Sequence, residues 1–270
     1  MTDDSAVPPP PAPEIDITVP HSARVWNYWL GGKDNYAVDR AAGDQYRETF
    51  PQIADVARAG RYFLARAVRF LAGEAGIRQF LDIGTGLPTV DNTHEIAQRV
   101  APESRIVYVD NDPLVLAHAR ALLTSTPEGA TDYIDADLRT PATILRAATA
   151  TLDFAAPVGL ILIGTLGHVP DDEEARSIMR RLLAALPSGS YLALADSINV
   201  GEAHKEAARR YSEGGPVGYH LRSAEQIAAF FDGLELAEPG LVPVSRWRPE
   251  PSPFEHADIE TTLAAVGRKP

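Results

Sequence analysis

The nine residues FLDIGTGLP, numbered 80–88, decide the fold. An apolar strand that contains Asp82 leads into a turn with two glycines, Gly84 and Gly86, and a helical pattern follows after Pro88. Glycine lets the backbone approach a bound ligand closely, and the amides of the turn and of the helix start make a polar pocket. The stretch therefore predicts an α/β unit with a ligand site at the carboxyl edge of its strand.

The pattern of a strand followed by a helix repeats downstream of this unit. Strands are expected at 79–84, 105–110, 131–137, 158–164 and 190–197, with helices at 92–100, 113–123, 142–150 and 171–186 between them. This alternation favours right-handed crossovers and a mostly parallel sheet.

The C-terminal part follows another pattern. A charged helix with a Gly-rich loop is expected at 201–222 and a helix at 223–233, before two extended segments, 234–247 and 259–269, joined by a Pro-rich loop. A strand–loop–strand connection without a helix requires an antiparallel pair. We therefore predict an α/β, Rossmann-like fold with a seven-stranded, mostly parallel sheet, an antiparallel last strand and helices on both faces.

The N-terminal quarter divides into a tail and a helical region. Residues 1–20 hold six of the 22 prolines and predict a flexible tail. Residues 21–74 read as helices, and 24–40 gather four aromatic residues around a Gly31–Gly32 turn. We expect a helical cap or lid over a domain that spans 75–270; packing of the aromatic rings on the core is the alternative.

Composition excludes several classes of function. Acidic residues outnumber basic ones by 37 to 25, giving a net charge of −12, which disfavours binding to nucleic acid or to an anionic membrane. There is no cysteine, the histidines are scattered, and no signal peptide or membrane span is recognisable. We expect a cytoplasmic protein without a metal site that acts on a small or cationic molecule.

Two later strands also end in aspartate. Asp110 closes the strand 105–110, 26 residues after Gly84, and a carboxylate at this place accepts hydrogen bonds from both ribose hydroxyls. Capping the next helix is its alternative role, but Asp112 is better placed to cap. Asp137 and Leu138 follow the third strand, where a carboxylate and an apolar neighbour suit an adenine ring.

The order of these three strand ends resembles the class I S-adenosylmethionine-dependent methyltransferases. Residues 24–40, 80–123, 135–145 and 230–249 resemble more narrowly a bacterial family of S-adenosyl methyltransferases of unassigned substrate. The resemblance covers roughly residues 21–270. It implies that S-adenosylmethionine is the cofactor and that a methyl group is transferred to an unidentified small-molecule acceptor.

The resemblance also implies roles for single residues. Gly84 and Gly86 would approach the methionine part of the cofactor, with Asp82 ordering the turn. Asp110 would hold the ribose, and Asn111 would lie beside the adenine.

Further contacts are implied at the third strand and in the N-terminal region. Asp137 and Leu138 would meet the adenine. The segment that would close over the cofactor contains Gly31, Gly32, Lys33 and Asp34. Pro88 departs from the broad superfamily, because a third glycine often stands near that place.

The loop after the fourth strand, 164–170, borders both donor and acceptor in this superfamily. Thr165 is therefore a candidate cofactor contact, and His168 is a candidate general base, with local packing as its alternative. His204 and His220 are expected to be solvated. The acceptor pocket is expected among 21–40, 164–170 and 197–222, with four candidate tyrosines: Tyr28, Tyr36, Tyr211 and Tyr219.

Other functions stay open at this point. A nicotinamide-dependent oxidoreductase would want G-x-G-x-x-G, whereas position 89 here is Thr89. A protein that binds S-adenosylmethionine without transferring its methyl group, as a sensor or interaction module, fits the same residues. Radical chemistry with this cofactor needs a cysteine-held cluster, which a chain without cysteine cannot provide.

Overall fold

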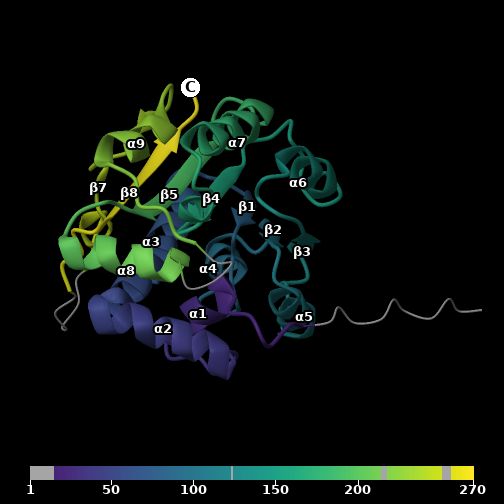
Figure 1. The fold of residues 1–270 in the computed structure, drawn as a ribbon. Coiled ribbons are helices and arrows are strands. Elements are labelled where there is room, and N and C mark those ends of the chain that lie inside the picture. The colour runs from purple at the N-terminus through teal and green to yellow at the C-terminus, as the bar shows by residue number, and fades with distance from the viewer. Residues whose placement is uncertain (1–14, 123, 214–217, 251–256) are drawn as a thin grey trace, which may run out of the picture.

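A mixed sheet forms the centre of the molecule (Figure 1). The computed structural model describes residues 15–122, 124–213, 218–250 and 257–270, and within them eight strands follow the order β3-β2-β1-β4-β5-β8-β6, with β7 also pairing with β8. The strands are β1 Gln79–Ile83, β2 Arg105–Asp110, β3 Ala130–Asp135, β4 Gly159–Ile163, β5 Tyr191–Ser197, β6 Glu235–Leu236, β7 Val242–Pro243 and β8 Thr262–Arg268. β1 to β5 are parallel, and β8 is antiparallel to β5.

The predicted mostly parallel sheet with an antiparallel last strand is confirmed. The number of strands differs, because the extended segment 234–247 is broken by a turn at Gly240, whose φ is +86° and whose amide donates to the Ala237 carbonyl at 2.9 Å. Its two ends, β6 and β7, pair with opposite ends of β8. One predicted strand is thus two short ones.

Helices cover both faces of the sheet. The α-helices are α1 Ser22–Trp29, α2 Ala37–Thr49, α3 Ile53–Gly73, α4 Thr93–Val100, α5 Pro113–Leu122, α6 Pro141–Ala148, α7 Asp172–Ala185, α8 Glu202–Glu213 and α9 Ala224–Ala228, with short 3-10 turns at Leu166–His168, Ala229–Phe231 and Val244–Arg246. None of the described helices combines the length and apolar character that a membrane span requires.

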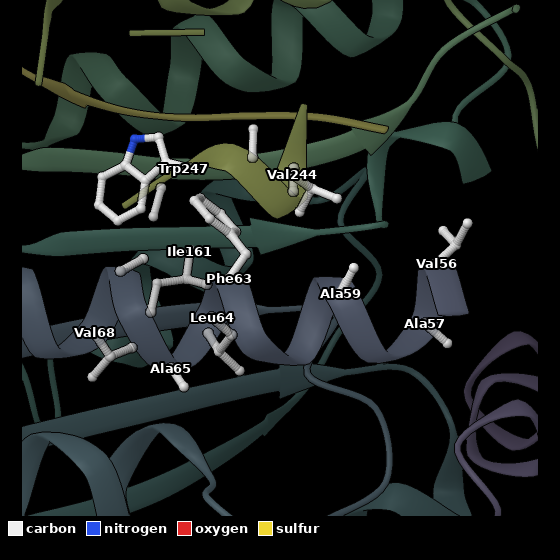
Figure 2. Packing of buried hydrophobic residues seen from close by; sticks show 14 of the residues in the cluster. Val56, Ala57, Ala59, Phe63, Leu64, Ala65, Val68, Ile161, Val244 and Trp247 are labelled. Carbon is white, nitrogen blue, oxygen red and sulfur yellow. The ribbon is translucent and has the colours of Figure 1, made fainter. Parts of the chain in front are cut away.

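Alternating side chains of the central strands pack into two separate cores. In β1, Phe80 joins the core under α3, whereas Leu81 and Ile83 join the core that α6, α7 and α9 cover. Figure 2 shows Phe63 of α3 pointing toward Trp247, and their ring centroids are 5.3 Å apart. The central strands are almost wholly apolar because helices cover both faces of the sheet.

The two N-terminal helices pack beside α8 (Figure 1). An aromatic cluster joins them: the Tyr46 ring lies 5.2 Å from Trp29 and 5.6 Å from Tyr211 between centroids. The expectation that His204 is solvated is wrong. Its ring stacks on Phe50 at 4.6 Å and is 1% exposed, because α8 is amphipathic and turns this face toward α2.

Residues 1–14 of the predicted tail lie outside the described residues. Residues 15–20 are described and continue into α1. The division into tail, cap and main domain stays a prediction. Within the predicted cap, α3 contacts β4, β5 and β8 directly. α1 contacts α2 and α3, and α2 also contacts α3 and α8.

Candidate active site

A cavity of about 700 Å³ opens at the carboxyl ends of β1, β2, β3 and β4. Its floor is the glycine turn after β1, and its walls come from the residues that follow the neighbouring strands. Residues between 15 and 30 and the middle of α3, at Gly60, Arg61 and Leu64, line the remaining side. The parallel sheet therefore brings together strand ends that lie far apart in the sequence.

Both glycines of the turn adopt a backbone that favours glycine. The φ angle is +72° at Gly84 and +67° at Gly86. A Cβ atom on Gly84 would stand 2.6 Å from the Thr165 hydroxyl, so Thr165 packs directly on this turn. A Cβ on Gly86 would meet no atom within 4 Å, which leaves its side of the backbone open to the cavity.

Two buried carboxylates lie beside the turn, and Asp110 bonds it directly. Asp110 accepts hydrogen bonds from the backbone amides of Gly86 at 2.9 Å and Asp112 at 3.0 Å, and burial raises its pKa. Asp82 accepts from the Thr93 hydroxyl at 2.6 Å, and burial raises its pKa to about 6. Both side chains line the cavity, so a ligand that carries positive charge would favour their ionised forms.

The predicted adenine contacts also line the cavity. Asn111 is exposed toward it, and Leu138 is buried at its wall. Asp137 accepts a hydrogen bond from the Arg139 amide at 2.8 Å. The structure thus brings Asp82, the glycine turn, Asp110, Asn111, Asp137, Leu138 and Thr165 to one cavity.

The segment 31–34 is placed differently. Gly31, Gly32, Lys33 and Asp34 are not among the residues that line the cavity. Gly32 instead packs on the cavity residue Asn27, whose Nδ2 would be 2.3 Å from a Cβ at position 32. Lys33 and Asp34 are exposed. Closure of this segment over the cofactor stays a prediction.

Sequence reasoning assigned residues 15–20 to a flexible tail and did not identify His21 as a site residue. His21 lines the cavity, its amide donates to Asp39 at 2.9 Å, and its Nδ1 lies 3.0 Å from an Asp112 carboxylate oxygen. Burial, the largest single influence, raises the pKa of Asp112, but the neighbouring His21, the Leu114 amide and the Arg24 charge together outweigh it, so the pKa is lowered. No local pattern marks this network, because its partners come from three separate helices. Asp112 also caps α5 through the Leu114 amide at 2.9 Å, as expected.

His168 lies at the far wall of the cavity. Its Nδ1 is 2.8 Å from the Gly218 carbonyl, which can only accept, so Nδ1 carries the proton and Nε2 keeps a free lone pair. Burial lowers the pKa of His168 to about 4. The ring is therefore neutral at physiological pH and presents a base.

A second cavity of about 580 Å³ adjoins the first and shares Arg139, His168 and Gly218 with it. Tyr219 lines this cavity, and its ring lies 5.1 Å from that of His168. The other three candidate tyrosines lie elsewhere: Tyr28 bonds Asp44 at 2.6 Å, Tyr36 packs on Arg24, and Tyr211 belongs to the aromatic cluster. His220 is exposed at its rim, as expected.

The residues that the structure describes contain no group of three or more His, Cys, Asp or Glu side chains that could hold a metal ion.

Comparison with solved structures gives two close likenesses. A DUF574 family protein from Streptomyces avermitilis is 47% identical, with 95% of this chain and 100% of that chain covered and a TM-score of 0.90. A protein from Thermobifida fusca, named provisionally as a methyltransferase, is 40% identical over 98% and 99% of the chains, with a TM-score of 0.86. A SAM-dependent methyltransferase from Anabaena variabilis, 14% identical over 96% and 97% of the chains with a TM-score of 0.50, shares the fold.

No curated protein matches the chain. The sequence model of the S-adenosyl methyltransferase family, in contrast, matches residues 9–270, nearly the whole length. Together with the cavity at the strand ends, this match shows that the chain belongs to the S-adenosyl methyltransferase family.

Proposed function

We propose that the protein transfers a methyl group from S-adenosylmethionine to a small-molecule acceptor. The observation that carries the proposal is the convergence of the Gly84–Gly86 turn, Asp110 and Asp137 on one cavity, in a chain of this family. A volume of about 700 Å³ lies within the range of small-molecule sites.

The residues of the first cavity fit the cofactor. Asp110 offers buried carboxylate oxygens to hydroxyl donors, and the open side of Gly86 allows close approach to the backbone. Asp82 places a second carboxylate near a ligand that is cationic. When bound, S-adenosylmethionine supplies a methyl group on an electrophilic sulfonium.

The chain has three tasks: to hold the donor, to align the acceptor and to exclude water. The glycine turn and Thr165 fix the floor, and residues 15–27 cover the cavity. His168 supports the last part of this proposal, because its Nε2 keeps a free lone pair that can receive a proton from the acceptor. A base with a pKa of about 4 is weak, so it suits an acceptor whose proton becomes acidic only as the new bond to carbon forms.

Calorimetric titration with S-adenosylmethionine and with NAD tests the cofactor. We expect the wild type to bind S-adenosylmethionine and not NAD, and Asp110→Asn to weaken binding by about tenfold to a hundredfold, because charge-assisted hydrogen bonds are lost. Asp135→Asn is the matched control: Asp135 pairs with Asp110 in the sheet register but is exposed and outside the cavity. NAD binding in place of S-adenosylmethionine would sink the proposal in favour of an oxidoreductase.

Catalysis is tested separately from binding. Single-turnover reactions with methyl-labelled S-adenosylmethionine and fractionated small molecules should move label to an acceptor, and His168→Gln should slow that step while leaving cofactor affinity within about twofold of the wild type. Tight cofactor binding with no transfer in any fraction would instead support a sensor or interaction module.

A further inference from the structure

The second cavity has a charge opposite to that of the protein as a whole. The chain carries a net charge of −12, yet the described residues that line this cavity include Arg139, Lys205 and Arg209 and no aspartate or glutamate. Lys205 and Arg209 stand one helical turn apart on α8 and therefore face the same side. A group of cations on one wall of a cavity attracts an anion.

Each of these cations has acidic partners that do not line the second cavity: Arg139 lies 3.4 Å from Asp137 and 3.6 Å from Glu174. Lys205 Nζ contacts Glu202, which is 92% exposed, and Arg209 contacts Glu206 and Glu213 on its own helix. Exposed pairs of this kind contribute little free energy, about 0–1 kcal/mol each. A ligand anion can therefore displace Glu202 from Lys205 at small cost, whereas at Arg209 it competes with the two carboxylates of Glu206 and Glu213.

The rest of the lining is apolar or neutral. Pro170, Ala208, Leu221 and the ring of Tyr219 give an apolar surface. The Tyr219 hydroxyl is not available to a ligand, because it donates to the buried Asp196. The cavity therefore suits a molecule with an apolar body and an anionic group directed toward α8.

The position of the second cavity connects it to the donor site. Arg139 and His168 belong to both cavities, and Arg139 bonds the His168 carbonyl at 2.7 Å. A molecule held on α8 would thus reach the first cavity beside the His168 ring. The Arg139 guanidinium lies at this passage.

We propose that the second cavity binds the methyl acceptor and that the acceptor is a small anion, a carboxylate or phosphate ester with an apolar body. This inference rests on the proposed methyltransferase function and deepens it. It keeps the expectation of a small-molecule acceptor but replaces the cationic alternative, drawn from net charge alone, with an anion.

The test uses the full chain saturated with S-adenosylhomocysteine and four probes of similar size: benzoate, phenyl phosphate, benzamide and benzylamine. We expect the two anions to bind, and benzamide and benzylamine to bind at least tenfold more weakly. Arg209→Gln should weaken the preferred anion by about threefold to tenfold. Arg210→Gln is the matched control, because Arg210 is the next residue on α8, also pairs with Glu206, and does not line the cavity.

The outcomes separate the two proposals. Preference for benzoate indicates a carboxylate acceptor and preference for phenyl phosphate indicates a phosphate. Equal binding of benzamide and the anions, or equal effects of the two arginine variants, overturns the anionic site while cofactor binding leaves the proposed function intact. Failure to bind S-adenosylhomocysteine or S-adenosylmethionine at all would overturn the proposed function and the acceptor role together.

Discussion

The two neighbouring cavities differ in charge and in construction. The first cavity is built on backbone turns at strand ends, and aspartates outnumber arginines among its lining residues. The second cavity is formed by α8 and the loops beside it, and its lining contains cations but no carboxylate. The difference suits a cationic donor in one and an anionic acceptor in the other, with His168 between them. Substitutions that alter one cavity and leave the other unchanged therefore test whether donor and acceptor bind separately.

The largest expected effect is on the stability of the protein in acid, and it arises at His204 on α8, the helix that lines the second cavity. Burial lowers the pKa of His204 to about 4 from an ordinary value near 6.5, and neither ring nitrogen has a hydrogen-bond partner. As pH falls between these values, the unfolded chain takes up a proton that the folded chain does not, so the free energy of unfolding falls by up to about 3 kcal/mol. His204→Phe should remove this part of the loss, measured by urea unfolding at pH 7 and pH 4.5.

A control for this effect lies close by. His220 is exposed, and His220→Gln should leave the acid dependence nearly unchanged. His168 has a pKa lowered in the same direction, so some acid sensitivity should persist in His204→Phe. Identical pH profiles for His204→Phe and the wild type would show that the buried imidazole does not destabilise the acid form.

The next effect is on the affinity of the first cavity for S-adenosylmethionine as a function of pH. Burial raises the pKa of Asp82 to about 6, so its carboxyl is protonated below that pH and attracts a cation less. Affinity for S-adenosylmethionine should fall by about tenfold between pH 7 and pH 5. Asp82→Asn should bind more weakly at pH 7 and show a flatter profile in calorimetry. A wild-type affinity that is constant across this window would contradict the electrostatic role.

The smallest expected effect is on cofactor affinity, and it tests whether the segment 31–34 packs on Asn27 or closes over the cofactor. Gly32→Ala pushes a Cβ against Asn27 and should weaken cofactor binding by about threefold, whereas Lys33→Ala should change it by less than about twofold, because Lys33 is exposed. Fluorescence titration of both variants provides the comparison. A larger loss in Lys33→Ala would show that the segment closes over the cofactor.

The strand-end wall of the first cavity could be predicted from the sequence, because each of its parts lies within a few residues of the end of a strand. The glycine turn, Asp110 and Asp137 are local signals, and parallel topology alone brings them together. Nearly all residues that line the second cavity belong to 164–170 and 197–222, two of the three segments expected to form the acceptor pocket. The positive charge of its lining and the His21–Asp112 contact depend on how α1 and α8 pack, which no short motif encodes. The many charged residues of 201–222 gave no indication that α8 has a buried face, on which His204 lies. The turn at Gly240, which divides the segment 234–247 into two strands, was also not predicted.

A crystal structure of the protein with S-adenosylhomocysteine tests the central claim most directly. The account predicts the ribose hydroxyls on the Asp110 carboxylate, the adenine beside Asn111 and Leu138, and the sulfur facing the passage between the cavities at Arg139 and His168. A cofactor bound elsewhere, or a sulfur that faces away from the second cavity, would contradict it.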